Sequence, residues 1–376
     1  METANKKNRI IWLDQLRAIG IIFVILGHVS LDKEIIKLIY AFHMPLFFFI
    51  SGMTHREGKF SSLWDCIKYK APRLILPHIM MNLLMWSLWA YNFRILGDVK
   101  YGISTLIKGI LVGNNEIYQS ASNATWFLLV LFLIEVIYYL CEKFASGDKR
   151  KLTLLVSILA IISYVESING FNIPMLWHMD AVFTGLMFYH LGYYLFQYLQ
   201  VITGSKYYKN KVLLAFTIAA MVLAGLYIAE VNKRVSMAGN SYGSIMYFYI
   251  AALLLILVVI LIVMKLPQLP LLKYVGQNTL LYLGIHIPII RAFERGTKFF
   301  EINQGNQRAV LLAAIVFFIL IPIVGYINTF LPFVAGKPFK ASKYQRLQKA
   351  IGIISVIGIV IFTIMIFNLA GVSWSY

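Results

Sequence analysis

Charge and cysteine are both scarce in this chain. Only 13% of its 376 residues are charged and 60% are hydrophobic, whereas about a quarter of the residues of a soluble globular protein are charged. No polar stretch is long enough to form a separate soluble domain. The composition therefore excludes a soluble protein and predicts a single integral membrane domain over residues 1–376.

Several motifs that carry chemistry in other proteins are absent. The two cysteines, Cys66 and Cys141, are too few for a disulfide framework or a structural zinc site. The sequence has no glycine-rich nucleotide loop, no HExxH pair, no Cys/His ligand set and no nucleophile elbow, so we expect no bound metal. No small-residue cleavage site follows the first apolar run, which predicts a retained helix rather than a signal peptide.

Long apolar runs are what the chain has in abundance. About 20 apolar residues cross a bilayer as a helix. The runs predict eleven spans, and ten is the alternative count because the fifth and ninth are short or interrupted. We expect an all-α, polytopic membrane helix bundle of about 10–11 transmembrane helices, without an internal repeat. The expected spans are 10–30, 36–54, 74–94, 123–142, 152–166, 177–199, 212–230, 244–264, 275–291, 309–332 and 351–370.

The formal net charge of +18 has two interpretations. One is nucleic-acid binding, but the Lys and Arg residues of membrane proteins collect in cytoplasmic loops, which is the simpler explanation. With the N-terminus inside, the inner segments carry about twice as many Lys and Arg residues as the outer segments. We therefore predict a multi-pass protein of the cell membrane, in contact with lipid, with a cytoplasmic N-terminus, an extracytoplasmic C-terminus and no nucleic-acid partner.

The first expected span contains ionisable residues. Such groups at membrane depth usually face a protein interior or a water-filled cavity. Arg17 and His28 are eleven residues apart, which places them on one helix face about 16 Å apart along the axis. Asp14, three residues before Arg17, is within reach of an ion pair. One such residue alone is usually structural, but three on one stripe predict a site, with Arg17 in the inner half and His28 near the outer end.

The second expected span, 36–54, adds a histidine and a pair of small residues. We expect His43 near the outer face, at a depth like that of His28, where it either shares the site or has a structural role. Ser51 and Gly52 allow the backbones of two helices to approach closely. The phenylalanines that precede them are expected to form a packing or lipid-facing surface.

A basic cluster of Lys68, Lys70 and Arg73 lies just before the third expected span. It is either a patch that sets topology and contacts lipid headgroups or a cradle for a phosphorylated cytosolic ligand, because Arg forks and Lys point charges suit phosphate oxygens. Charge alone favours the first interpretation. Later spans add Glu135 and His286, which indicate a polar interior within the apolar bundle.

The pattern Asp14-x-x-Arg17-x10-His28 resembles the signature at the start of the acyltransferase-3 family of membrane acyltransferases. FHMPLFFFISG, at 42–52, is similar to the next block of that family, especially in its fucose-4-O-acetylase-type branch. Three later blocks also resemble the family, namely Lys70-x-x-Arg73 before Pro77, TWFLLVLF at 125–132 and GQNTLLYLGIH at 276–286. The blocks cover almost the whole chain in the expected order.

The resemblance implies an O-acyltransferase, usually an O-acetyltransferase. Members of the family take an acyl group from cytosolic acyl-CoA, here acetyl-CoA as the expected donor, and deliver it to a hydroxyl, often on a cell-surface or exported carbohydrate. Some carry an extra extracytoplasmic domain of the SGNH esterase type, which is not found in this sequence. Either the bundle acts on its acceptor directly or a separate partner completes the transfer.

The resemblance also implies roles for the polar stripe of the first span. His28 would be the general base that deprotonates the acceptor hydroxyl or a transient acyl carrier, and imidazole suits either task because it titrates near neutral pH. Arg17 would stabilise developing negative charge or hold the acyl-CoA. Asp14 would hold Arg17.

Further residues are expected to bind the two substrates. Arg73, with Lys70 or Lys68, would bind the phosphates of CoA from the cytoplasmic side, although some members of the family have adjacent basic residues where this chain has separated ones. The expected substrate pocket contains four other side chains, those of His43, Ser51, Glu135 and His286.

The competing interpretation is a transporter or flippase for a polysaccharide or a small molecule. It too would place polar residues inside a helix bundle with a positive inner face. Two features favour the enzyme: the polar residues concentrate in the first spans, and the sequence has no repeat of two halves. A sensor or scaffold ranks last, because it needs no buried charge. The acceptor, the acyl chain and the oligomeric state stay open at this point.

Overall fold

The computed structural model of the protein describes six stretches of the chain, namely 10–90, 103–114, 117, 121–168, 175–298 and 305–369. Within them the chain forms helices joined by turns, together with an isolated β-bridge between Ser236 and Ser241. The predicted all-α bundle is thereby confirmed. The predicted sides of the two termini concern residues outside these stretches and stay predictions.

The helices follow one another along the chain in this order: α1 (Ile11–Gly27), α2 (Lys33–Tyr40), α3 (His43–Met53), α4 (Leu63–Ala90), α5 (Ile103–Val112), η2 (Asn123–Thr125), α6 (Trp126–Ala145), α7 (Lys149–Ile168), η3 (Leu176–His178), α8 (Met179–Gly204), α9 (Lys206–Lys209), α10 (Lys211–Val231), α11 (Ile245–Val263), α12 (Pro270–Gln277), α13 (Thr279–Lys298), α14 (Asn306–Phe330), η4 (Pro332–Ala335) and α15 (Gln345–Leu369).

Seven segments of the described chain are long and apolar enough to cross a membrane. They are the α2–α3 segment, the η2–α6 segment, α7, α10, α11, α14 and α15. Helices α1, α4, α8 and α13, of 17 to 28 residues, are interrupted by ionisable residues or prolines. A multi-pass membrane bundle is therefore present, and the number of ten or eleven spans stays a prediction.

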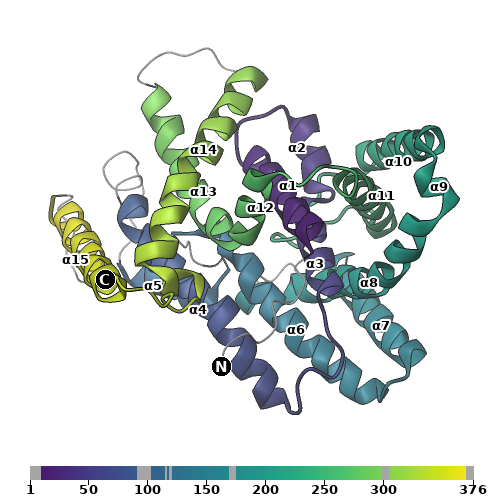
Figure 1. Cartoon of the computed structure of the whole chain (residues 1–376), viewed down its shortest axis with the longest axis horizontal. Coiled ribbons are helices and arrows are strands. Elements are labelled where there is room, and N and C mark those ends of the chain that lie inside the picture. The colour runs from purple at the N-terminus through teal and green to yellow at the C-terminus, as the bar shows by residue number, and fades with distance from the viewer. Residues whose placement is uncertain are drawn as a thin grey trace.

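Helix α1 lies in the middle of the bundle, while α15 and α10 lie on opposite flanks (Figure 1). The helices that pack against α1 include α3, α12, α13 and α14. Its buried side chains include Leu16, Ile21, Val24 and Ile25. Gly20 admits the ring of Phe47 from α3, because a Cβ at this glycine would stand 2.8 Å from the ring. The helix that carries Asp14, Arg17 and His28 is therefore held at the centre of the molecule.

Two expected boundaries differ from the structure. Helix α4 begins at Leu63, although the sequence predicts the third span only from residue 74, so the basic cluster lies on a helix and not in a loop. The single span predicted at 36–54 is divided into α2 and α3 by a break at Ala41 and Phe42. Pro45 then lies in the first turn of α3, where a missing backbone N–H is tolerated.

Helices α3 and α8 cross at two glycines. A Cβ at Gly52 would stand 1.8 Å from the carbonyl oxygen of Tyr189, and one at Gly192 would stand 2.0 Å from that of Phe49. The close approach predicted at Gly52 is thus found, and its partner is α8. Because helices in lipid associate through close packing of small residues, this crossing fixes the register of the two helices.

We predict that Gly192→Ala destabilises the protein, because the new methyl group has no room against α3. Overpacking of this kind costs about 1–3 kcal/mol. The matched control is Gly204→Ala on the same helix, where nothing lies within 4 Å of the added Cβ. The measurement is the thermal unfolding midpoint of the purified protein in detergent. Equal midpoints for the two variants would contradict the tight crossing.

Candidate functional site

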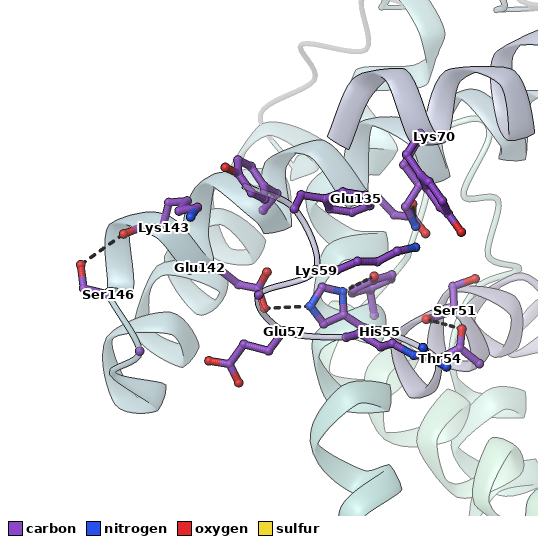
Figure 2. Close-up of a pocket in the computed structure, with 17 residues that line it drawn as sticks. Ser51, Thr54, His55, Glu57, Lys59, Lys70, Glu135, Glu142, Lys143 and Ser146 are labelled. Atoms are coloured by element: carbon purple, nitrogen blue, oxygen red, sulfur yellow. Dashed lines mark hydrogen bonds and ion pairs between the residues drawn. The ribbon is translucent and has the colours of Figure 1, made fainter. Parts of the chain in front are cut away.

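Two polar cavities lie at opposite ends of α3. The large cavity, of about 850 Å³, is lined by Ser51 near the end of α3 and by the segment that follows it (Figure 2). The small cavity, of about 200 Å³, is lined by His43 at the start of α3. Ser51 and His43 are eight residues apart, which corresponds to about 12 Å along a helix axis. The predicted site residues divide between these two cavities.

The small cavity brings three predicted histidines together. His28, the C-cap of α1, and His43 both line it. The ring of His286, on α13, has its centroid 5.1 Å from that of His28. Tyr40 joins the group, with its ring centroid 6.4 Å from that of His28 and 4.9 Å from that of His43. Residues 28 and 43 near the start of the chain and residue 286 near its end thus place their imidazoles at one end of the bundle.

Backbone carbonyls fix the orientation of two of these rings. Nδ1 of His43 lies 2.8 Å from the carbonyl oxygen of Ile39. Nδ1 of His286 lies 3.0 Å from the carbonyl oxygen of Tyr282 and 2.9 Å from that of Leu283. A carbonyl oxygen only accepts, so both Nδ1 atoms donate, and in a neutral ring Nε2 is then an acceptor.

One of those acceptors has no partner. Nε2 of His286 is buried and forms no hydrogen bond within the described chain. A buried polar atom without a partner costs free energy, so such an atom beside a cavity marks a place where a ligand or a neighbouring donor gains a hydrogen bond. The adjacent ring of His28 forms no hydrogen bond to a described residue. It can therefore be oriented toward His286 or toward a ligand in the cavity.

The rest of the small cavity combines aromatic and polar side chains. Trp126 and Tyr40 supply rings, and Ser236 and Arg234 come from the connection between α10 and α11. The Arg234 guanidinium lies over the ring of Tyr40, 4.4 Å from its centroid. Arg234 was not predicted, because nothing in its local sequence indicates that a loop about 200 residues away reaches the end of α1.

The predicted ion pair on α1 is present. Nη1 of Arg17 donates to Oδ1 of Asp14 at 3.2 Å, and Asp14 is buried. The other carboxylate oxygen accepts from Nε2 of Gln277, on α12, at 3.4 Å. A Cβ at Gly276 would stand 1.7 Å from the carbonyl oxygen of Asp14, so α12 lies directly against α1 here. Asp14 therefore joins α1 to α12 as well as holding Arg17.

Arg17 and His28 do not share either of the two polar cavities. His28 borders the small cavity, whereas neither Arg17 nor Asp14 borders either polar cavity. The two residues share a helix face, as their spacing predicts, but the turns between them pack against neighbouring helices. The catalytic roles expected for Arg17 and Asp14 stay predictions.

The large cavity contains a histidine that sequence reasoning missed. Nε2 of His55 lies 2.8 Å from Oε1 of Glu142, and its Nδ1 lies 2.8 Å from the hydroxyl of Tyr189 (Figure 2). The carboxylate only accepts, so Nε2 donates to Glu142 and Nδ1 accepts from Tyr189. A signal was available: the run Thr54 to Lys59 places several charged residues directly after the small pair in a chain that has few charges.

Cations line the same cavity. Lys70 forms an ion pair with Glu135. Figure 2 shows Lys59 extending between His55 and Glu135, and its Nζ lies 3.4 Å from the ring centroid of Tyr69. The hydrogen bond from Lys59 lowers the pKa of the Tyr69 phenol. No carboxylate of the described chain forms an ion pair with three of the lining cations, namely Arg56, Lys59 and Lys143.

The three residues predicted to bind the cofactor have different positions. Lys70 lines the large cavity, whereas Lys68 and Arg73 are exposed and do not. Nζ of Lys68 lies 5.2 Å from the ring centroid of Trp64. Arg73 lies over the ring of Tyr69 at 3.7 Å and donates to the carbonyl oxygen of the same residue at 2.6 Å. Arg73 therefore contacts Tyr69, which lines the cavity, but Arg73 itself does not line the cavity.

The four predicted substrate-pocket residues also separate. His43 lines the small cavity, His286 packs against His28 beside it, and Ser51 and Glu135 line the large cavity. The Ser51 hydroxyl donates to the carbonyl oxygen of Phe47 at 2.8 Å, so its proton is already used. Within the described stretches, no three His, Cys, Asp or Glu side chains gather closely enough to hold a metal ion.

Comparison with known proteins adds one finding. A protein-family model described as an acyltransferase domain matches residues 10–327 of the chain. Searches of the curated proteins and of the solved structures find no match. The matched range contains both polar cavities and the ion pair on α1.

We predict that Asp14→Asn lowers the thermal unfolding midpoint, because it removes the charged partner of Arg17 and weakens the contact between α1 and α12. Hydrogen bonds to charged groups are worth about 1.5–3 kcal/mol. The double variant Asp14→Asn/Arg17→Gln should recover part of the loss, since it also removes the cation that has lost this carboxylate. Asp65→Asn, at an exposed carboxylate of α4, is the control. A double variant less stable than the single one would contradict this account.

Proposed function

The chain belongs to the acyltransferase-3 family, and on this basis we propose that it transfers an acetyl or other short acyl group from cytosolic acyl-CoA to a hydroxyl of a cell-surface or exported carbohydrate. Family membership together with the membrane-spanning helices makes it a membrane acyltransferase. The observation that carries the finer proposal is the pair of polar cavities at the two ends of α3, one rich in cations and one rich in histidines.

The large cavity is the proposed donor site. The segments at 54–60 and 143–147 that line it are the ones assigned to the cytoplasm by the distribution of Lys and Arg. Arg56, Lys59 and Lys143 have no carboxylate partner in the described chain, and cations of this kind suit the phosphates of CoA. A volume of about 850 Å³ is within the usual range for a cofactor pocket.

The small cavity is the proposed acceptor site. Its aromatic rings and polar side chains suit a sugar, since a sugar has apolar faces and polar edges. The similarity of residues 42–52 to the fucose-4-O-acetylase-type branch supports a carbohydrate. His28 is the proposed base, and His286 supports this role because its unpaired Nε2 can accept from one nitrogen of His28 and leave the other free.

The proposed reaction is an exchange of a thioester for an ester. The acceptor oxygen attacks the thioester carbonyl carbon while His28 takes the hydroxyl proton. The carbon–sulfur bond then breaks, and the leaving thiolate takes that proton from His28, so that an ester and a free thiol result. If His28 instead carries the acyl group, the same exchange occurs in two steps, first to the ring nitrogen and then to the hydroxyl.

The acyl group has to cover the length of α3 between the two cavities. Phe47, Phe48 and Phe49 occupy this part of the helix and are buried. Because buried apolar side chains exclude water, this stretch would protect the thioester from hydrolysis during transfer. A transporter also needs a passage between two faces, but the match to an acyltransferase family does not favour that alternative.

We predict that His28→Gln lowers the rate of acetyl transfer by about 10²–10⁴-fold, the usual contribution of a general base. His190→Gln is the matched control, because His190 is bound to Tyr138 and Thr153 and lines neither cavity. The assay follows radiolabelled acetyl-CoA into glycan with purified protein in lipid nanodiscs. Wild-type activity in the His28 variant would remove this residue from the reaction.

We predict that Lys59→Ala raises the KM for acetyl-CoA about tenfold or more, because a charge-assisted hydrogen bond to phosphate is lost. The KM for the acceptor should not change. Lys68→Ala is the control, since this lysine is exposed on α4 outside the cavity. Arg73→Ala should act only weakly, through Tyr69. An effect of Lys68→Ala equal to that of Lys59→Ala would argue against a donor site in the large cavity.

A further inference from the structure

We propose that the acceptor is an anionic glycan and that Arg234 binds its negative group in the small cavity. This inference rests on the proposed function, since it names the chemical class of the acceptor. It also assigns a binding role to a residue outside every block that resembles the family.

The charge of the small cavity is positive. Among the described residues that line it, Arg234 is the one side chain with a full charge. No Asp or Glu side chain takes part in the described lining. Outside the lining, Glu294 accepts a hydrogen bond from Ser30 at 3.1 Å. A neutral sugar would not need such a cation, whereas a carboxylate or phosphate would be stabilised by it.

The guanidinium of Arg234 keeps its hydrogen-bonding edge available. It stacks on Tyr40, and no carboxylate of the described chain forms an ion pair with it. Other cations near this end differ, because Lys37 lies 3.7 Å from Glu34 and 3.3 Å from Glu230. The N–H groups are therefore not taken by a carboxylate of the described chain, and their fork matches two oxygens of a carboxylate or phosphate.

The loop that carries Arg234 is tied in place. The side-chain amide of Asn232 donates to the carbonyl oxygen of Tyr242 at 3.0 Å and accepts from the backbone N–H of Ser244 at 2.8 Å. Ser236 and Ser241 exchange backbone hydrogen bonds of 2.7 and 2.9 Å. Arg234 lies between these two sets of bonds, so its backbone is already ordered before a ligand arrives, which lowers the entropic cost of binding.

The position of Arg234 relates the anion to the reacting hydroxyl. Tyr40 contacts Arg234 and also packs against His28 and His43. A glycan whose anionic group meets Arg234 therefore presents a hydroxyl of the same sugar, or of the next one, to His28. Uronic acids and sugars joined by phosphodiesters both have this chemistry.

The test uses the protein in nanodiscs with radiolabelled acetyl-CoA. The acceptor is de-O-acetylated surface glycan from cells that lack the protein. One portion of glycan is left untreated, a second has its carboxylates reduced to alcohols, and a third is stripped of phosphodiesters with hydrofluoric acid. We expect one treatment to lower transfer at least tenfold, which also identifies the anion. Equal transfer to all three portions would overturn the inference while leaving the proposed function intact.

Two variants of one loop give the matched comparison. Arg234→Gln should raise the KM for untreated glycan at least tenfold, leave the KM for acetyl-CoA unchanged and abolish the preference for anionic over neutral glycan. Lys233→Gln, which removes the adjacent exposed cation outside the cavity lining, should behave as wild type. Arg234→Lys should be intermediate, because it keeps the charge but not the fork. A preference that survives Arg234→Gln, or is lost equally in Lys233→Gln, would overturn the assignment.

Two further outcomes separate the sources of failure. If no portion of glycan accepts acetyl from the wild-type protein, the proposed function fails and the inference fails with it. If glycan charge has no effect but Arg234→Gln removes a preference for succinyl-CoA over acetyl-CoA, the anion belongs to the acyl group, and an anionic acceptor is wrong.

Discussion

Both cavities depend on the crossing of α3 and α8. Gly52 and Gly192 each lie so close to the other helix's backbone that a single methyl group would not fit. In lipid, burying apolar surface drives helix association only weakly, so a contact of this kind sets which helices pair and in what register. Helix α3 begins at His43 in the small cavity and leads to His55 in the large one, and α8 supplies Tyr189 to His55. A slip of α3 along α8 would therefore disturb both cavities together.

A proline places the polar wall of the small cavity. Pro288 lies inside α13 and has no backbone N–H, so the carbonyl oxygen of Gly284, four residues earlier, lacks its usual helical partner. The Ser122 hydroxyl donates to that oxygen at 2.5 Å. Ser122 immediately precedes η2, whose Asn123 lines the cavity. In a membrane interior such a carbonyl must find a partner inside the protein, and here the partner fixes α13, with its histidine, against the start of α6.

Features set by local spacing could be predicted from the sequence, and features set by tertiary packing could not. The helical class, the ion pair of Asp14 with Arg17 and the shared depth of His28 and His43 all follow from hydrophobic runs and helix periodicity. The basic cluster lies on α4 because this helix starts earlier than expected. Successive positions on a helix differ by about 100°, so Lys70 faces the large cavity while Lys68 and Arg73 do not. Arg234 depends on where a distant loop folds back, and no local pattern records that.

Asp14 and Arg17 lie on the same stripe of α1 as His28 but line neither polar cavity. The packing around Asp14 explains this position. A buried ion pair contributes little to stability, because desolvation offsets the attraction, so its position calls for another reason. Asp14 accepts from Gln277 at the end of α12, and α13 follows one residue later. Helix α13 in turn brings His286 beside His28. The pair thus fixes one end of α1 against the same α12–α13 unit that meets the other end of α1 at the proposed acceptor site. A change at Arg17 therefore has a route to His28 through two packed helices, although the two side chains are about 16 Å apart along the axis.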